Sequence, residues 1–107
     1  MATKGTELES RDTHCGLTPL SWAAMNGQDA VVKVLVEKGA ELEIRDIDGL
    51  TPLSLAAMNG HEEVVKLLIE NGAELDSRDT KGRTPLSLAV EMRHEAVEKL
   101  LIGEKRY

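Results

Sequence analysis

Aromatic residues and cysteine are scarce in this sequence. Its 107 residues include one Trp, one Tyr, no Phe and one Cys. A single cysteine, Cys15, excludes a disulfide framework within the chain, so we expect an intracellular, cytoplasmic protein. With so few aromatic rings, the core must consist of Leu, Val, Ala, Ile and Met, which suits the closely packed helices of one small domain.

Long apolar runs and an excess of positive charge are also missing. No apolar run approaches the length of a membrane span, and residues 1–4 lead into polar sequence rather than a signal-peptide core. The formal net charge is −6, whereas nucleic acids and anionic membranes are bound by basic surfaces. We therefore expect no nucleic-acid partner and no membrane partner.

The sequence does contain an internal repeat. The tetrapeptide Thr-Pro-Leu-Ser begins at Thr18, at Thr51 and at Thr84, which are 33 residues apart each time. A fixed period of this length is typical of stacked structural units. It divides the chain into the remnant arm of a preceding repeat, two full repeats, and a third repeat with the character of a C-terminal cap, at residues 1–12, 13–45, 46–78 and 79–107.

Each repeat is predicted to form two helices. In the second repeat, Thr51 is a good N-cap, and Pro52 suits the first helical position, where its missing N–H costs nothing. Gly60 ends this helix in a left-handed conformation, and a second helix starts near His61. The apolar faces of the two helices consist of Leu53, Ala56, Ala57, Val64, Val65, Leu67, Leu68 and Ile69. An extended arm and a hairpin-like tip follow.

The two ends of the array depart from this pattern. Residues 4–12 match residues 38–46, as if the chain began with the arm of a repeat whose helices are missing. In the third repeat, Glu98 stands where the other repeats have valine, Arg93 replaces the stop glycine, and Val90 replaces an alanine. A charge on the outward stacking face is what a repeat array needs where stacking ends.

With these motifs, the chain resembles the ankyrin repeat family over roughly residues 13–102. The second repeat reads Asp46-x-x-Gly49-x-Thr51-Pro52-Leu53-x-Leu55-Ala56-Ala57-x-x-Gly60-His61, followed by Val64-Val65-x-Leu67-Leu68 and Gly72-Ala73. The resemblance implies an all-α repeat fold, a solenoid of stacked helix-turn-helix units with projecting β-hairpin-like loops. It also implies that a protein partner binds the concave side, which is formed by the loop tips and the first helices.

Two positions differ from the family pattern. The family's His after Thr-Pro-Leu is replaced by Ser21, Ser54 and Ser87, so the hydrogen bond of that imidazole must be replaced or lost. The Asn common in the family's inter-repeat arm is replaced by Glu43 and Asp76, so an asparagine-centred modification or hydrogen bond does not carry over.

The sequence gives no support for catalytic or metal chemistry. No His or Asp recurs beside the repeated serines as a base and orienter. His61 and His94 occupy the family's Gly-His position, where the imidazole ties backbone groups together. His14 and Cys15 are adjacent, and two neighbouring residues on one loop cannot build a tetrahedral metal site. We therefore expect no enzyme activity, no cofactor and no metal.

The predicted binding surface follows from the family's layout. Its residues lie at the tips and at the exposed ends of the first helices: His14, Cys15, Leu17, Met25, Asn26, Ile47, Asp48, Leu50, Met58, Asn59, Thr80, Lys81, Arg83, Glu91 and Met92. Apolar residues recur among them, and exposed apolar surface often marks a partner site. In the alternative interpretation, Leu17 and Leu50 pack against the neighbouring tip, and the repeated Met-Asn pair reflects duplication alone.

Trp22 takes the place of two leucines of the other repeats, so we expect it in the core, with the alternative that its edge is partly exposed on the first repeat. The first repeat has no preceding pair of helices, and we expect this uncapped face to be the weak end of the array. The leading function is a non-catalytic protein-recognition module, most simply a monomer. Self-association through the uncapped face or Cys15, a structural repeat unit, and an engineered consensus-like protein without a natural partner are the alternatives.

Overall fold

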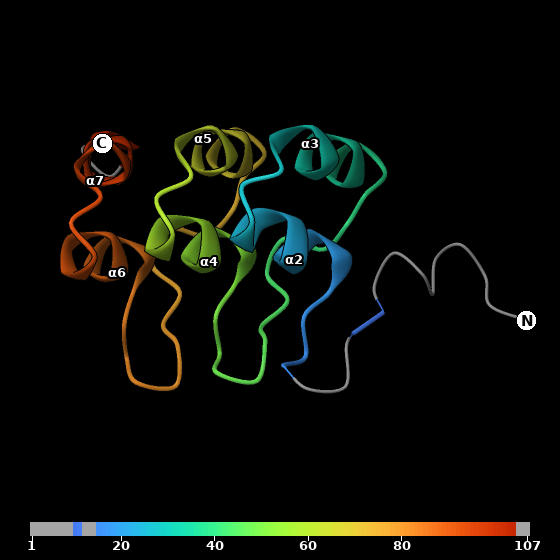
Figure 1. The fold of residues 1–107 in the computed structure, drawn as a ribbon, viewed down its shortest axis with the longest axis horizontal. Coiled ribbons are helices and arrows are strands. Elements are labelled where there is room, and N and C mark those ends of the chain that lie inside the picture. Colours follow the sequence, from blue (N-terminus) through green and yellow to red (C-terminus); the bar gives the residue numbers. More distant parts are fainter. Residues whose placement is uncertain (1–9, 12–14, 105–107) are drawn as a thin grey trace, which may run out of the picture.

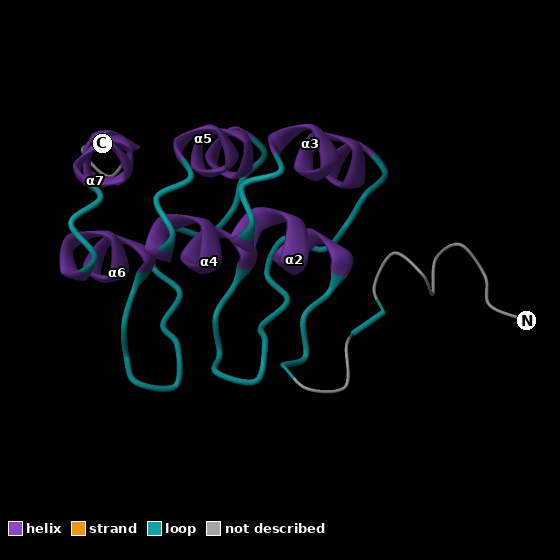
Figure 2. Ribbon diagram, viewed as in Figure 1, coloured by secondary structure: helices purple, strands orange, loops and turns teal. Residues whose placement is uncertain are grey.

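The protein is a stack of three helix pairs. A computed structural model describes residues 10–11 and 15–104, and within them all regular structure is helical (Figures 1 and 2). The helices are α2 (Pro19–Met25), α3 (Asp29–Glu37), α4 (Pro52–Met58), α5 (Glu62–Glu70), α6 (Pro85–Glu91) and α7 (Glu95–Glu104). Each pair begins 33 residues after the last, which confirms the period predicted from the sequence.

The helices form two parallel layers. The short helices α2, α4 and α6 make one layer and the longer helices α3, α5 and α7 the other, and the loops between pairs project from the short-helix layer (Figure 1). Within each layer, a helix packs on its equivalent in the next repeat. This arrangement is the predicted solenoid of helix-turn-helix units.

A threonine begins each short helix, as predicted. Thr51 accepts a hydrogen bond from the backbone N–H of Ser54 at 3.2 Å, and Pro52 occupies the first helical position. The Ser54 hydroxyl lies 3.0 Å from the Thr51 hydroxyl, so the serine that replaces the family's histidine joins the cap of its own helix. In the third repeat, Thr84 and Ser87 form a reciprocal capping box.

The second residue after each short helix adopts a left-handed conformation. Gly27 and Gly60 have φ angles of 70° and 75°, which confirms their predicted role as helix stops. Arg93 stands at the same place in the third repeat and keeps a φ of 64°. The left-handed backbone costs a non-glycine residue about 1–2 kcal/mol. Arg93 keeps this conformation all the same, so we infer that packing between the repeats offsets the cost.

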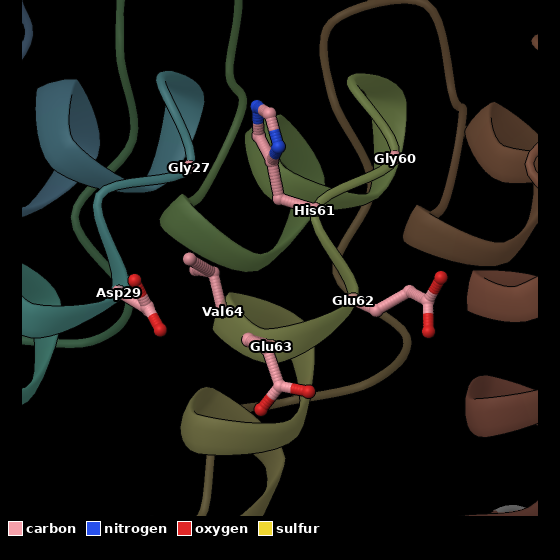
Figure 3. A pocket seen from close by; sticks show the side chains of 7 residues that line it. All are labelled: Gly27, Asp29, Gly60, His61, Glu62, Glu63 and Val64. Carbon is pink, nitrogen blue, oxygen red and sulfur yellow. The ribbon is translucent and has the colours of Figure 1, made fainter.

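Histidine side chains link neighbouring repeats. The His61 Nε2 lies 3.0 Å from the carbonyl oxygen of Met25, and the His94 Nε2 lies 3.0 Å from that of Met58. Because a carbonyl only accepts, each imidazole donates to the end of the preceding short helix. The His61 ring lies beside Gly27 (Figure 3). The prediction of a structural role for these histidines is confirmed.

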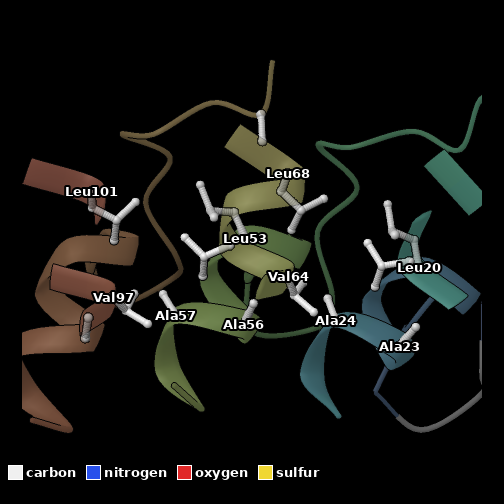
Figure 4. Packing of buried hydrophobic residues seen from close by; sticks show 14 of the residues in the cluster. Leu20, Ala23, Ala24, Leu53, Ala56, Ala57, Val64, Leu68, Val97 and Leu101 are labelled. Carbon is white, nitrogen blue, oxygen red and sulfur yellow. The ribbon is translucent and has the colours of Figure 1, made fainter. Parts of the chain in front are cut away.

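The core runs continuously through the three repeats between the two layers. The alanines of the short helices are at most 2% exposed, and Leu53, Val64 and Leu68 are buried to the same extent (Figure 4). Small alanines let the short helices approach closely, while the branched aliphatic residues of the long helices fill the space between layers. The composition of the core is therefore the one expected from a sequence almost without aromatics.

Trp22 does not lie in the core, so that prediction is wrong. Its side chain is 56% exposed, whereas the equivalent Leu55 and Leu88 are 2% and 1% exposed. The leucines are covered by the repeat that precedes them, and no described helix precedes α2. Trp22 therefore occupies a stacking position at the end of the stack.

The outer face of the third repeat is mixed in polarity. Ser87 is exposed and Glu98 is partly exposed, in agreement with a cap. Val90 is 52% exposed and Ile102 45% exposed on the same repeat, which leaves apolar surface beside the polar groups. Because of this exposed apolar surface, the C-terminal cap character stays a prediction. The remnant arm also stays a prediction, since most of residues 1–12 lie outside the described residues.

Candidate protein-binding surface

An aspartate shapes each described tip. One carboxylate oxygen of Asp46 accepts from the backbone N–H groups of Asp48 and Leu50, each at 2.9 Å. Asp79 accepts in the same way from Lys81 and Arg83, at 2.9 and 2.8 Å. Such a side-chain bond two residues ahead in the chain sets the turn locally, so each tip has the same shape in consecutive repeats.

Backbone hydrogen bonds join one tip to the next. The Ile47 N–H donates to the Cys15 carbonyl at 2.8 Å, and the Thr80 N–H donates to the Asp48 carbonyl at 3.0 Å. The tips come so close that a Cβ on Gly49 would lie 2.9 Å from the Thr80 nitrogen. Because each tip is tied to its neighbour, the side chains on the tips have fixed relative positions.

Arginine side chains strengthen this connection along the arms. Arg11 donates to the carbonyl of Arg45 at 3.3 Å, and Arg45 donates to the carbonyl of Arg78 in the following repeat. Arg45 also donates to the Gly49 carbonyl of its own tip at 3.2 Å. The same residue thus fixes its own tip and the next arm.

Several predicted site residues are exposed on the tips. Ile47 is 67% exposed, the largest exposed fraction among the large apolar side chains that are exposed. Cys15, Asp48, Thr80 and Lys81 are exposed as well. His14 was predicted beside them but lies outside the described residues.

Leu17 and Leu50 do not contribute exposed apolar surface, so this part of the prediction is wrong. Their side chains are only 8% and 5% exposed, and they form a second apolar cluster with Leu55 and Leu88. The cluster fills the angle between the tips and the short helices, which is the alternative interpretation of these leucines. Met25 and Met58 pack against it and remain partly exposed.

Two of the predicted residues at the ends of the short helices form hydrogen bonds within their own helix. The side-chain amides of Asn26 and Asn59 donate to the carbonyls of Trp22 and Leu55, at 2.9 and 3.0 Å. These bonds cap the helix ends, although both asparagines are exposed. Met92 is 51% exposed at the corresponding place in the third repeat.

Arg83 is mainly a partner of the tip aspartate. Its Nε donates to the Asp79 carboxylate at 2.8 Å, and its Nη1 lies 3.7 Å from the exposed carboxylate of Glu91. Burial alone raises the pKa of Asp79, but the backbone N–H and side chain of Arg83 and the N–H of Lys81 together lower this pKa below its ordinary 3.8. The carboxylate therefore stays charged although its side chain is fully buried.

A hollow lies between the starts of α3 and α5. It has a volume of about 370 Å³ and is lined by Gly27, Asp29, Gly60, His61, Glu62, Glu63 and Val64 (Figure 3). The imidazole is already bound to the preceding helix, and the lining holds no Ser, Thr or Cys to act as a nucleophile. The hollow therefore gives no support for nucleophilic catalysis by a Ser, Thr or Cys side chain.

Residues 10–11 and 15–104 contain neither a metal-binding cluster nor a membrane-spanning helix. This part of the chain holds no group of three or more His, Cys, Asp or Glu side chains placed to bind a metal ion. None of its helices has the length and apolar character needed to cross a bilayer.

Sequence reasoning missed the contacts that hold the tips in place. The Asp79–Arg83 pair and the Arg45 bonds join residues of the arms and tips that looked variable and exposed. One signal for them was present: aspartate recurs at the same place in the second and third repeats, three residues before a glycine. Its side-chain acceptor makes it a turn-forming residue.

Comparison with known proteins agrees with this architecture. A family model described as ankyrin repeats (3 copies) matches residues 2–79 and, in a second alignment, residues 20–106. No curated protein matches the sequence. The two matched stretches together span nearly the whole chain. The structure has the stacked helix pairs, the threonine N-caps and the projecting tips that the resemblance to this family implied. The chain belongs to the ankyrin repeat family.

Proposed function

We propose that this chain is a non-catalytic protein–protein interaction module that binds a partner across its tips and the ends of its short helices. Ankyrin repeats are in general protein–protein interaction modules. The finer proposal concerns which surface binds and which residues contact the partner. The exposed thiol of Cys15, the single cysteine of the sequence, also suits a reducing compartment, so we place the protein inside the cell.

Ile47 is the observation that carries the proposal. Its side chain is 67% exposed, while its backbone is held by the bond to Cys15 and by the Asp46 turn. An apolar side chain on a rigid, exposed tip gains burial on binding and loses little conformational freedom. The partly exposed Met58 lies on α4 of the same repeat and is an adaptable neighbour for such a contact.

The proposed contact surface leaves out three residues of the predicted one, two leucines and one arginine. Leu17 and Leu50 support the surface from beneath, and Arg83 acts chiefly through Asp79. The residues proposed to touch the partner are Cys15, Met25, Asn26, Ile47, Asp48, Met58, Asn59, Thr80, Lys81, Glu91 and Met92. His14 remains a predicted member of this surface.

The test begins by identifying a partner and ends with an affinity. A photoreactive residue in place of Asp48 would capture the protein that contacts the tips, and the purified partner would then be titrated by calorimetry. We expect Ile47→Ala to weaken binding about tenfold, the effect of losing one well-buried apolar contact. Ile102→Ala, which shortens another exposed isoleucine on α7, is the matched control and should leave the affinity unchanged.

Equal affinity of the Ile47→Ala variant and the wild-type protein would contradict the proposed surface. A loss of affinity of the same size in both variants would do so too, since the partner would then cover the layer of long helices. Circular dichroism of each variant checks that the fold is intact, which is expected because both side chains are exposed.

A further inference from the structure

The first repeat exposes a row of large apolar side chains at the N-terminal end of the stack. We call Trp22, Val31 and Val34 the leading face; their exposed fractions are 56%, 45% and 48%. In the second repeat, the residues equivalent to Trp22 and Val31 are Leu55 and Val64, which are 2% and 1% exposed. The leading face therefore has the composition of a stacking interface, although no described helix covers it.

The third repeat exposes the complementary side of the same kind of interface. We call Leu86, Val90 and Ile102 the trailing face. Val90 is 52% exposed, although the equivalent Ala57 is completely buried against the following repeat. An open groove of about 560 Å³, with largely apolar walls, lies here between α6 and the last tip, lined by Arg83, Thr84, Leu86, Ser87, Val90 and Glu91.

We propose that the chain associates head to tail with a second copy, with Trp22 of one molecule seated in the groove beside Val90 of the other. The argument is continuity with the interfaces inside the chain. Each short helix packs on the next, α2 on α4 and α4 on α6, and always presents a leading side to the repeat before it and a trailing side to the repeat after it. The α2 and α6 ends of the stack expose one side of each kind (Figure 1).

The sizes of the two side chains favour an intermolecular contact. Trp22 is larger than Leu55, and Val90 is larger than Ala57, so each of them would overfill its own place in the spacing found between repeats in the chain. Two separate molecules have no connecting arm that fixes this spacing. They can settle at the distance that the indole requires, and the open groove leaves room for it.

Two residues of the third repeat affect how tightly the copies bind. Glu98 stands where Val32 and Val65 are completely buried, and covering a carboxylate with apolar surface is unfavourable. Arg93 replaces Gly60, whose added Cβ would meet the His94 ring. A second copy offers Gln28 at the position of that histidine, so the arginine does not meet an imidazole. Glu98 thus makes the association weak, and Glu98→Val should tighten it about tenfold.

The geometry also sets the form of the assembly. A contact between two different faces leaves one unused face at each end, so it forms open chains unless the rotation happens to close a ring. The average mass should therefore rise steadily with concentration, without a plateau at the dimer. A symmetric pairing of two leading faces would stop at the dimer.

Trp22 reports on its own burial because it is the only tryptophan in the sequence. Fluorescence and sedimentation are measured over a wide concentration range, with a reductant that excludes dimers linked through the exposed Cys15. We expect the emission to shift to the blue and the average mass to rise together. An emission maximum and a mass that stay constant up to millimolar concentration would overturn the proposal.

A complementation experiment tests the pairing of faces. Trp22→Glu blocks the leading face and Val90→Glu blocks the trailing face; both side chains are about half exposed, so each variant should fold. Each variant alone should be monomeric, and a mixture should form one-to-one dimers. The emission of the tryptophan in the Val90→Glu variant should then shift to the blue as the Trp22→Glu variant is added.

The control is Ile47→Glu, which adds the same charge at an exposed isoleucine on a tip and should self-associate like the wild-type protein. Dimers of the Val90→Glu variant alone would show a symmetric pairing of leading faces and would contradict the proposal. A mixture that stays monomeric while the wild-type protein associates would also contradict it. The outcome is independent of the proposed partner surface, which lies on the tips.

Discussion

Asp79 shows how a single residue links the tip of a repeat to the stability of the whole. Its side chain is fully buried, yet it accepts from two backbone N–H groups and from the Arg83 guanidinium. Burial of an unpaired carboxylate would be costly, and these three donors offset that cost. The equivalent Asp46 accepts from two backbone N–H groups in the same way. The residue equivalent to Arg83 is Leu50, so Asp46 has no guanidinium partner at that position.

The lowered pKa of Asp79 predicts a dependence of stability on pH. Because the folded pKa lies below the unfolded value of 3.8, the charged carboxylate stabilises the fold above that pH, and this contribution disappears as the pH falls through the folded pKa. We expect Asp79→Asn to lower the free energy of unfolding by about 1–2 kcal/mol at neutral pH, with the difference from wild type shrinking below about pH 4.

Urea unfolding of both proteins across the acid range measures this effect. The matched variant is Arg83→Leu, which gives the third tip the side chain of Leu50 and should flatten the pH dependence while leaving the turn intact. A difference between Asp79→Asn and wild type that stays constant from neutral to acid pH would show that the carboxylate does not carry the stabilisation.

At the scale of the helices, the junction between repeats depends on one glycine and one imidazole. Gly60 has a φ of 75° and lies against the His94 ring, where an added Cβ would be 2.6 Å from Nδ1. The imidazole in turn donates to the Met58 carbonyl at the end of α4. The start of α7 is therefore fixed to the end of α4 in the preceding repeat.

This junction predicts unequal effects of two similar substitutions. Gly72 has a φ of 91°, but an added Cβ there would meet no atom within 4 Å. We expect Gly72→Ala to destabilise by about 1 kcal/mol from backbone strain alone. Gly60→Ala adds the overlap with the ring and should cost about 2–4 kcal/mol, as measured by urea unfolding.

A double-mutant cycle separates the steric overlap with the His94 ring from the strain of the left-handed backbone at position 60. Combining Gly60→Ala with His94→Ala removes the ring that the new methyl group strikes, so the two losses should sum to more than the loss in the double variant. Equal losses for the two glycine substitutions, or strict additivity in the cycle, would contradict the steric account.

Local signals explain which elements were predictable from the sequence. The starts and ends of the helices depend on residues close in the chain, such as Thr51, Pro52 and Gly60, and the structure confirms them. Burial of a given position depends instead on the neighbouring repeat. Leu50 and Trp22 were both placed wrongly, because nothing in a single repeat says whether a leucine on a tip turns inward or whether a stacking position is covered.

The tips illustrate the same distinction for the candidate site. Their position after each arm followed from the period, and the exposure of Ile47 agrees with that layout. The arginine bonds along the arms join residues 33 or 34 apart, from Arg11 to Arg45 and from Arg45 to Arg78. Such contacts exist only once the repeats are stacked, so no pattern within one repeat could predict them.

Over the whole molecule, the three repeats share one pattern but do not contribute equally to the core. The largest completely buried aliphatic side chains number two in the first repeat, five in the second and three in the third. They are Leu20 and Val32; then Leu53, Leu55, Val64, Val65 and Leu68; and then Leu88, Val97 and Leu101. Since repeats contact only their neighbours, stability follows the stacking that each one has.

This inequality predicts an order of local opening. We expect the amides of the second repeat to be the best protected from hydrogen exchange, those of the third to be intermediate, and those of the first to be the least protected. The amides of Ala23, Ala56 and Ala89 are matched reporters, because these alanines occupy equivalent helical positions and are all buried. The measurement is made in dilute solution with a reductant, so that contacts between copies do not protect the first repeat. Equal protection of Ala23 and Ala56 in the monomer would mean that the stack opens only as a unit and that the exposed leading face costs the first repeat nothing.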